Sequence, residues 1–323
     1  MNVKTFTTVA GTVAALLLAS GAALAQAVWK PARPVTLVVP YAAGGGTDTT
    51  ARAVAKQLTV LWGQPVVVEN LPGADGLIGT RKVMDAAPDG LTLLFQVPAI
   101  VVTRYMPGLK GIDPLAKLDP VTAVSQSPAA IVVSAKLPIK TFGEFLQYCK
   151  TAPQPCSLAT GEALARIYGK QLAAEAGLPN LIIVNYRGTS AMVTDMIANN
   201  VNMGFTGITA ALPHYKAGTL KILATQDDKR AAALPEVPTT AEAGFPQFRS
   251  VTWYGMFAPK GTPPAVTLGI VAALREAVKD PNVQATITAA GAEPVVNSPA
   301  AFAAQVQAES ERWGALVKRY PFD

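Results

Sequence analysis

The sequence has few of the residues that most often carry out catalysis. Among 323 residues there is one histidine, His214, and there are two cysteines. A hydrolase with a Ser-His-Asp triad often places its serine in a G-x-S-x-G turn, and this motif does not occur. One histidine, together with cysteines that we expect to be paired, leaves scattered carboxylates as the remaining metal ligands. We therefore expect no catalytic residues, no metal site and no cofactor.

The usual signatures of phosphate and nucleic-acid binding are also missing. The glycines Gly44–Gly46 are not followed by the Gly-Lys-Ser/Thr of a P-loop, and they lack the G-x-G-x-x-G spacing of a dinucleotide-binding turn. The net charge is +6, but the basic residues are scattered along the chain. We interpret them as a solvated surface that weakly attracts anionic solutes, and we expect no nucleic-acid partner.

Long apolar runs are absent except near the N-terminus. There Lys4 precedes a short apolar run, Val9–Leu18, and Ala23-Leu-Ala25 has the small-x-small pattern of a cleavage site. The run is shorter than the roughly 20 residues that cross a membrane. We predict a signal peptide over residues 1–25, with Ala27 as the alternative cleavage point, and export to the periplasm. The other interpretation is an uncleaved anchor.

The two cysteines, Cys149 and Cys156, flank a short turn that contains two prolines. Export would place them in an oxidising compartment, and the turn can bring them together. We predict a disulfide, which would add about 2.5 kcal/mol of stability by closing a short loop. The alternative is two free thiols.

Strands and helices alternate along most of the chain, which indicates parallel sheets with helices on both faces. Half of the residues are hydrophobic, and the length favours two domains. We expect two sheets joined by crossings at Ser125–Pro128 and Phe248–Ser250, so that domain 1 comprises residues 26–127 plus 250–323 and domain 2 residues 128–249. The expected strands are Val35–Val39, Val66–Val68, Leu91–Val97, Ala129–Ser134, Cys156–Ala159, Leu181–Asn185, Val201–Phe205, Leu220–Thr225 and Val251–Ala258. The expected helices are Thr49–Leu61, Leu77–Ala86, Thr141–Cys149, Ala163–Ala176, one from Gly188–Ser190 to near Asn199, Pro263–Lys279, Pro281–Ala290 and Ser298–Tyr320.

The first strand is followed by an arrangement that can hold an anion. The buried strand Val35–Val39 leads into Gly44–Gly46, whose backbone N–H groups are exposed by the lack of side chains. Thr47 and Asp48 stand where we expect the N-cap of the next helix. Strand, glycine loop and helix N-terminus together can bind an anion without a basic side chain. The alternative is a tight turn that packs helix on strand, with Asp48 acting as a cap.

Two further loops follow strands of the predicted second domain. They are Thr160–Ala163 and Tyr186–Ser190, and each places small residues at a helix start. Ligands bind at the carboxyl ends of strands in such sheets, so these loops and Ala43–Asp48 can share one cleft. Arg187 is either a carboxylate clamp or an exposed loop residue.

In their order and spacing, motifs along nearly the whole mature chain resemble those of one known family. The chain resembles the Bug-type periplasmic receptors, the substrate-binding proteins of tripartite tricarboxylate transporters. The matching stretches are Trp29–Pro34, Pro40–Asp48, Val68–Gly73 with Gly76 and Gly79, Pro88–Thr92, Tyr186–Ser190, Lys229-Arg230, Leu234–Thr239, Glu242–Gly244, Trp253–Gly255 and Ala258-Pro259.

The resemblance implies a two-domain α/β periplasmic binding protein of the Venus-flytrap type, similar to type II. Such a protein captures a small organic acid, here a di- or tricarboxylate or an aromatic acid, and delivers it to a membrane permease. We expect a monomer. The ligand-binding residues that follow from the motifs are Tyr41, Ala43, Gly44, Gly45, Thr47, Asp48, Thr160, Gly161, Glu162, Ala163, Tyr186, Arg187, Gly188, Thr189 and Ser190. Phe95, Phe205, Trp253 and Tyr254 either line the pocket with Tyr41 or belong to the core.

The chain departs from the family pattern at Glu162, which brings a carboxylate to a loop expected to bind an anion. Glu162 either pairs with Arg166 one turn later or contacts a hydroxyl or positive group of the ligand. Asn202 stands where the family often has Asp. Two alternative functions remain: a receptor that presents its ligand to a membrane sensor, and an exported enzyme that uses Asp48 and Glu162 as acid and base.

Overall fold

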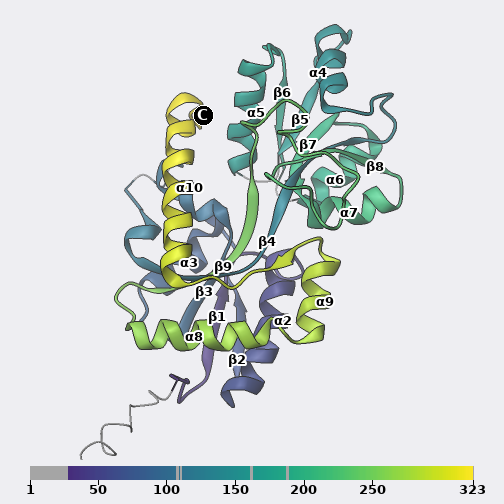
Figure 1. The fold of residues 1–323 in the computed structure, drawn as a ribbon. Coiled ribbons are helices and arrows are strands. Elements are labelled where there is room, and N and C mark those ends of the chain that lie inside the picture. Colours follow the sequence, from purple (N-terminus) through teal and green to yellow (C-terminus); the bar gives the residue numbers. More distant parts are fainter. Residues whose placement is uncertain (1–27, 107–108, 110, 161–162, 187–188, 323) are drawn as a thin grey trace, which may run out of the picture.

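The protein consists of two lobes that are joined by two long strands and flanked by a long C-terminal helix (Figure 1). The computed structural model describes residues 28–106, 109, 111–160, 163–186 and 189–322. The predicted signal peptide lies outside the described residues. Ten strands form one continuous hydrogen-bonded system, with the order β2-β1-β3-β9-β4-β7-β5-β6, and β8 and β10 also pair with β4.

The first lobe contains a parallel three-stranded unit in which β1 is the middle strand. Helices α2, α8 and α9 pack together beside this unit in the lower half of Figure 1, and their apolar side chains form one core with those of β1 and β3. The first-lobe elements are β1 (Val35–Val39), α2 (Gly46–Trp62), β2 (Val66–Asn70), η1 (Ala74–Gly76), α3 (Leu77–Met84), β3 (Thr92–Gln96), η2 (Pro98–Tyr105), η3 (Pro114–Ala116), α8 (Pro264–Ala277), α9 (Pro281–Ala289) and β10 (Glu293–Pro294).

The second lobe contains a second parallel unit, in which β5 lies between β6 and β7. Its four helices surround these strands in the upper half of Figure 1. The second-lobe elements are α4 (Phe142–Thr151), β5 (Ser157–Thr160), α5 (Ala163–Glu175), β6 (Ile182–Asn185), α6 (Thr189–Ala198), β7 (Met203–Gly207), α7 (Ile208–Lys216) and β8 (Leu220–Thr225).

Two antiparallel strands, β4 (Leu118–Ser134) and β9 (Val251–Pro259), connect the lobes. The first part of β4 pairs with β9, and its last residues, Ala129–Ser134, pair with β7 and β8 of the second lobe. The stretch Ser125–Pro128, expected as a crossing segment, therefore lies inside an unbroken strand. Each parallel unit was expected from the sequence, whereas the antiparallel pairing that joins them was not.

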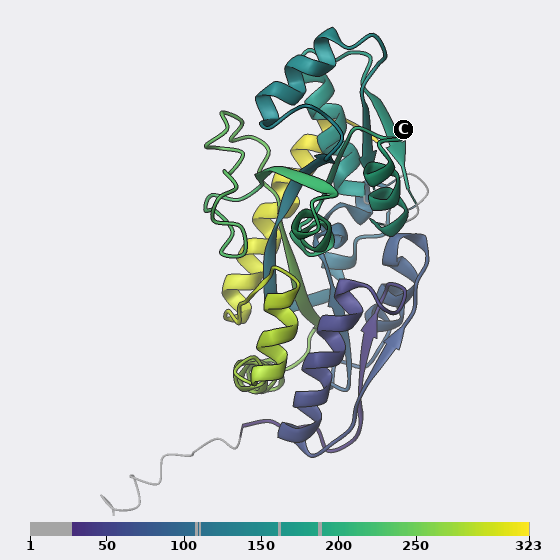
Figure 2. The same ribbon diagram turned by 90° about the vertical axis from the view of Figure 1, so that its right-hand side faces the viewer.

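The C-terminal helix α10 (Pro299–Arg319) runs along both lobes (Figures 1 and 2). Near its start, Phe302 packs against Trp253 and Phe257 of β9. Near its end, Trp313 packs against Tyr168 of α5, at 4.7 Å between ring centroids. These aromatic residues belong to one buried apolar cluster that extends through both lobes. The core is thus continuous along α10 even though the sheet divides into two units.

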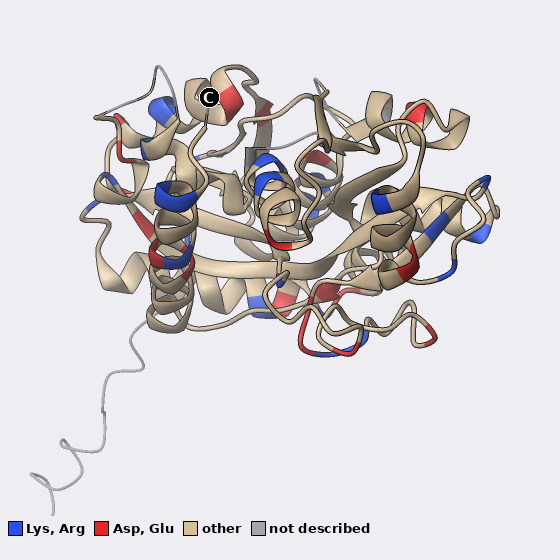
Figure 3. Ribbon diagram, turned by 90° about the horizontal axis from the view of Figure 1, so that it is seen from above, with Lys and Arg blue, Asp and Glu red and all other residues tan. Residues whose placement is uncertain are grey.

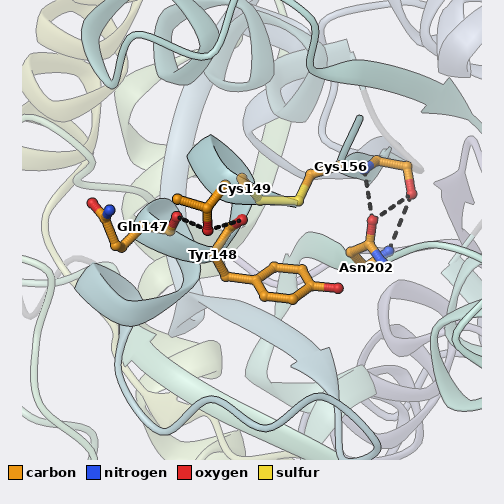
Figure 4. The surroundings of a disulfide bond; sticks show 7 residues. Gln147, Tyr148, Cys149, Cys156 and Asn202 are labelled. Carbon is orange, nitrogen blue, oxygen red and sulfur yellow. Dashed lines mark hydrogen bonds between the residues drawn. A yellow bond between two sulfur atoms is a disulfide. The ribbon is translucent and has the colours of Figure 1, made fainter. Parts of the chain in front are cut away.

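The disulfide between Cys149 and Cys156 is present, which confirms the prediction (Figure 4). It ties the end of α4 to the residue before β5, with 5.4 Å between the two Cα atoms. Asn202, close to the disulfide in Figure 4, accepts hydrogen bonds through Oδ1 from the N–H of Ser157 at 2.9 Å and from its hydroxyl at 3.2 Å. Asn202 therefore fixes the start of β5, a structural role for a position that the sequence left without one.

The surface carries charges of both signs. In Figure 3 the positions of lysines and arginines are interspersed with those of aspartates and glutamates along the ribbon, in agreement with the scattered basic residues of the sequence. Among the described residues, no helix combines the length and the apolar composition that crossing a membrane requires.

Candidate functional site

The glycine loop after β1 leads directly into the N-terminus of α2. The N-cap is Gly45, with an extended backbone, and no described side chain caps the helix. Gly44 adopts φ +86°, a conformation that glycine allows without strain. The first N–H groups of a helix have no partner within the helix, so this end can accept an anion. The prediction that Thr47 and Asp48 form the N-cap was wrong, because the helix already begins at Gly46.

Asp48 instead lies in the first turn of α2 and holds the loop from inside the helix. Its carboxylate accepts hydrogen bonds from the backbone N–H of Gly44 at 2.9 Å, from Arg52 Nε at 3.0 Å and from Asn70 Nδ2 at 2.9 Å. Burial alone would raise the pKa of Asp48, but these three donors together lower it below its usual value. Asp48 is thus a buried anion that is satisfied by its own chain, and it positions the glycine loop.

The ends of β1, β2 and β3 are joined by a second set of hydrogen bonds. Asn70 at the end of β2 also donates to the carbonyl of Tyr41, at 3.1 Å. The hydroxyl of Tyr41 donates to Oε1 of Gln96 at the end of β3, at 2.6 Å. The carboxyl ends of all three parallel strands therefore meet beside the glycine loop, at the edge where ligands commonly bind in such sheets.

In the second lobe, the loops after β5 and β6 begin side by side because Thr160 pairs with Asn185. Thr160 is buried, and its hydroxyl donates to Oδ1 of Asn185 at 2.8 Å. The N–H of Tyr186 donates to the carbonyl of Thr160, also at 2.8 Å. The described polar groups of Thr160 thus hold the two loops together within the lobe.

Tyr186 is held by Asp195 on α6. Its hydroxyl donates to Oδ2 of Asp195 at 2.6 Å, and burial together with this acceptor raises the pKa of Tyr186 to about 12. Thr189, the first residue of α6, is partly buried. Four other predicted site residues, Gly161, Glu162, Arg187 and Gly188, lie outside the described residues, and for Ala163 and Ser190 the described part is the backbone.

The two lobes meet at the start of α2. A Cβ atom at Gly46 would lie 2.7 Å from the Tyr254 hydroxyl on β9 and 3.6 Å from Cγ2 of Thr209 on α7 of the second lobe. The other predicted first-lobe residues, Ala43, Gly44 and Gly45, are exposed, and Thr47 is partly buried. The glycine loop therefore lies at the boundary between the lobes, and its residues Ala43, Gly44 and Gly45 face the solvent.

A cavity of about 30 Å³ lies between the lobes next to this contact. Pro98 and Ala99 line it from η2, directly after β3, and Leu164 and Ala165 line it from the first turn of α5. The corner between β7 and α7, which contains Gly207, lines it as well and continues to Thr209 at the glycine loop. Residues of both lobes thus line one common space, but no described residue of the three predicted loops is among them.

Sequence reasoning missed part of this lining. Pro98, Ala99, Thr206 and Gln226 are cavity residues that no motif indicated. Their place in the topology could have indicated them. Each of these residues lies at or near the end of a strand or just beyond it, and therefore at the same edge of the sheet as the predicted loops.

The aromatic residues that were expected either to line the pocket or to belong to the core fall into two groups. Phe205 lines the cavity, whereas Trp253 is fully buried and donates through Nε1 to the Glu309 carboxylate at 2.9 Å. Phe95 and Tyr254 are buried and stack on each other with an interplanar angle of 7°.

Two remaining predictions concern the partner of Arg166 and the absence of a metal site. The guanidinium of Arg166 lies 5.4 Å from the ring centroid of Phe322, near the C-terminus, and its suggested partner Glu162 is outside the described residues. Within the described ranges, no group of three or more His, Cys, Asp or Glu residues is placed to hold a metal ion.

The sequence of this chain is similar to those of known proteins over most of its length. A profile of the family described as "Tripartite tricarboxylate transporter family receptor" matches residues 50–321. The chain is 32% identical to Protein BugT of Bordetella pertussis over 293 residues, which cover 89% of both proteins. It is 33% identical over 293 residues to a protein from the tcbD-tcbE intergenic region of Pseudomonas sp. strain P51, which cover 90% of this chain and 87% of that protein.

Solved structures share the architecture. The periplasmic binding protein BugD is 33% identical, with a TM-score of 0.77 over 90% of this chain and 98% of BugD. A Rhodopseudomonas palustris protein solved with adipate gives a TM-score of 0.80 at 28% identity, covering 89% of this chain and 97% of that one. MatC from Rhodopseudomonas palustris, solved with malate, gives 0.75 at 31% identity, covering 89% and 99%.

These similarities confirm the predicted fold class, a two-domain α/β periplasmic binding protein. The family consists of solute-binding receptors and not of enzymes. The chain belongs to the receptor family of the tripartite tricarboxylate transporters.

Proposed function

We propose that this chain captures a small organic carboxylate between its two lobes in the periplasm and delivers it to a membrane permease of the tripartite tricarboxylate type. The observation that supports this most directly is the start of α2, which has no described side-chain cap and lies against the second lobe at Thr209. A carboxylate placed there would satisfy amides that the helix leaves without partners. Two structural relatives were solved with adipate and with malate, both dicarboxylates.

The proposed binding residues are those of the three loops named from the sequence, Tyr41–Asp48, Thr160–Ala163 and Tyr186–Ser190. Asp48 and Thr160 have a supporting role in this proposal, because their side chains hold neighbouring strand ends. The proposed domain boundaries are also those of the sequence: residues 26–127 with 250–323, and residues 128–249. The chain acts as a monomer in this proposal, and residues 1–25 are its cleaved export signal.

A stability screen tests the proposal. We expect one acid from a panel of di- and tricarboxylates, hydroxy acids and aromatic acids to raise the melting temperature, since a ligand at about 100 times its dissociation constant adds roughly 2.7 kcal/mol of stability. The matched control is the amide of the same acid, which keeps the shape and loses the charge. The proposal would be contradicted if the whole panel left the melting temperature unchanged, or if the bound acid were consumed.

Delivery to a permease needs a separate test. Cells that lack this chain should take up the binding acid slowly, and the purified chain added back to spheroplasts should restore uptake. If binding is tight but uptake is unaffected, the chain serves a different membrane partner.

A further inference from the structure

The two strands that connect the lobes have different surroundings on their two faces. Pro128 of β4 pairs with Val251 of β9. The residues that follow them in the sequence, Ala129 and Thr252, line the cavity between the lobes. Pro128 and Val251 instead line two larger pockets, of about 400 and 330 Å³. Because successive residues of a strand point to opposite faces, these two pockets lie on the other side of the connecting strands.

The two pockets adjoin at Gln126 and Asp227, and we call them together the rear groove. One wall of its larger part belongs to the first lobe and consists of Thr288 in α9 and residues 291–293. The opposite wall belongs to the second lobe and consists of residues 229–233, which follow β8. The rear groove therefore separates the two lobes, as the cavity does on the other face of the connecting strands.

The spaces on the two faces differ in width. On the face of the cavity, which measures about 30 Å³, the lobes approach each other closely at Gly46 and Thr209. On the opposite face, the rear groove is wide. A rotation of the lobes about β4 and β9 that opens the cavity narrows the rear groove, because the two spaces lie on opposite faces of the same strands.

The two walls of the rear groove carry charges of opposite sign. Lys229 is exposed on the wall of the second lobe, and Glu293 is exposed on the wall of the first lobe. Neither of them forms an ion pair with a residue that the structure describes. As the groove narrows, the distance between its walls falls and the Coulomb attraction between these two charges increases. This attraction favours the form in which the lobes are apart on the side of the cavity.

The other charged residues in the larger part of the rear groove already have partners. Nε of Arg230 donates to both carboxylate oxygens of Glu242, at 3.1 and 2.9 Å. Asp227 lies 3.8 Å from a guanidinium nitrogen of Arg249. Both partners belong to the same lobe as the residues they contact, so these pairs do not depend on the distance between the lobes. Lys229 and Glu293 are therefore the charges that respond to the width of the groove.

We propose that the rear groove sets the balance between open and closed forms of the receptor, and that attraction between Lys229 and Glu293 across it favours the open form. A ligand that closes the lobes works against this attraction, so the two charges lower the apparent affinity from outside the proposed binding loops. The inference rests on the proposed function, because it takes the ligand to bind between the lobes. It adds a device that keeps the empty receptor open.

The distance between the lobes measures this balance without any ligand. Spin labels attached to Lys56→Cys on α2 and to Lys216→Cys on α7, which are exposed positions of different lobes, report it by electron paramagnetic resonance. We expect a short distance for the closed form and a longer one for the open form in the unliganded protein. The acid selected by the stability screen should remove the longer distance.

Charge variants test the attraction. Glu293→Gln and Lys229→Gln should each raise the ratio of closed to open form roughly two- to fivefold, the range expected for an exposed ion pair. The effect should largely disappear in about 1 M salt, which screens exposed charges. Exchange of the two charges, Lys229→Glu with Glu293→Lys, should restore the parent ratio. Lys318→Gln, which removes an exposed charge of α10, is the matched control.

A bulky side chain tests the groove independently of charge. Ala232 is exposed on the wall of the second lobe, so Ala232→Trp places an indole in the groove and should hinder its narrowing. The closed form should then predominate without ligand, and the acid selected by the screen should bind more tightly, by at most the reciprocal of the closed fraction in the parent. Ala174→Trp, at an exposed position of α5, is the matched control.

The outcomes separate this inference from the proposed function. If the acid binds but the distance between the lobes does not respond to it, or if Ala232→Trp increases the open form, the inference is overturned and the proposed function stands. If the charge variants leave the ratio unchanged, Lys229 and Glu293 do not favour the open form and the inference is wrong. If no acid binds while Ala232→Trp still shifts the distance toward the closed form, the proposed function fails and the role of the groove is supported.

Discussion

At the scale of single residues, Asp48 shows how a buried charge can shape the glycine loop through hydrogen bonds within the chain. Its carboxylate is almost completely buried, with a side-chain exposure of 5%, and it receives donors from the loop, from its own helix and from β2. The loop that it holds has no described capping side chain at the helix start. Removing this one charge should therefore disturb the loop more than any change at its exposed glycines.

Replacing Asp48 by Asn should lower the free energy of unfolding at pH 7 by about 1.5–3 kcal/mol, because hydrogen bonds to a charged group are lost. The pKa of Asp48 is lowered by folding, so its stabilising effect is complete at neutral pH and is lost as the pH falls below about 4. Urea unfolding should show a difference in the free energy of unfolding between variant and parent that is smaller at pH 3 than at pH 7. Asp75→Asn, which removes an exposed carboxylate of η1, is the control. A difference that stays constant from pH 7 to pH 3 would show that the negative charge of Asp48 is not the source of the stabilisation.

We predict that position 46 must be glycine because a larger residue would not fit there. Its backbone conformation does not itself require glycine. A Cβ atom at this position would lie 2.7 Å from the Tyr254 hydroxyl, and its backbone is that of an ordinary helix start. Gly46→Ala should therefore cost about 1–3 kcal/mol through overpacking. The neighbouring Gly45→Ala, whose added Cβ would have its nearest described neighbour at 3.8 Å, should cost less. Equal melting temperatures for the two variants would contradict the close contact.

Some of this residue detail was within reach of the sequence, and some was not. The glycine loop, the helix after it and the disulfide are local patterns, and local patterns can be recognised from spacing. The roles of Asp48 and Asn202 depend on partners 22 and 45 positions away, which spacing does not reveal. The cavity between the lobes depends on the meeting of six separate segments, so the position of its residues at strand ends was the one signal that the sequence offered.

At the scale of elements, the strands and helices of each parallel unit were predicted well because buried strands and amphipathic helices have strong periodicity. Thr141 caps α4 and accepts a hydrogen bond through its hydroxyl from the N–H of Glu144 at 3.1 Å, and the Glu144 carboxylate accepts from the N–H of Lys140 at 2.6 Å. The first half of β4 was missed because Asp119, Pro120 and Ser125 interrupt its apolar pattern. Register shifts beside two of these positions accommodate the interruption within the strand.

The disulfide should stabilise the end of α4 against β5. Cys149→Ser combined with Cys156→Ser should lower the free energy of unfolding by about 2.5 kcal/mol, as the entropy of a short closed loop predicts. Denaturant unfolding with and without a thiol reductant measures this: the parent should lose stability on reduction, and the double variant should not respond. A parent that is unaffected by complete reduction would show that the loop is held by other contacts.

Helix α10 holds the two lobes along one side. Arg312 on this helix donates to the carbonyl of Arg249 at 2.6 Å and to the Tyr168 hydroxyl at 3.2 Å, and its guanidinium lies 4.9 Å from the Trp313 ring centroid. At the end of the chain, Lys170 of α5 donates to the carbonyl of Pro321 at 2.6 Å. These contacts tie the last turns of α10 to the second lobe, whereas its first turns pack on β9.

Arg312→Ala should loosen this attachment and lower the free energy of unfolding by roughly 1–3 kcal/mol, because the Arg249 carbonyl and the Tyr168 hydroxyl lose a charged donor. Hydrogen exchange should speed up in the last turns of α10 and in the facing part of α5. Lys318→Ala, an exposed position on the same helix, is the matched control. Unchanged exchange in Arg312→Ala would mean that aromatic packing alone holds the helix.

At the scale of the whole molecule, the lobes share a continuous core along α10 and meet on the other side through smaller contacts at the glycine loop. The cavity at that meeting is too small for an entire organic acid, since about 30 Å³ holds one or two waters. If this space receives the ligand, as we propose, we expect the lobes to separate around β4 and β9 and then to close. We expect a mixture of open and closed forms that a ligand shifts toward closure.

The most direct test of carboxylate capture is a crystal structure of the chain with the acid that binds most tightly. The account predicts one molecule between the lobes, with a carboxylate oxygen about 3 Å from the first backbone N–H groups of α2 and further contacts to the second lobe. An acid bound to one lobe alone, or outside the space between Gly46 and the β7–α7 corner, would contradict it.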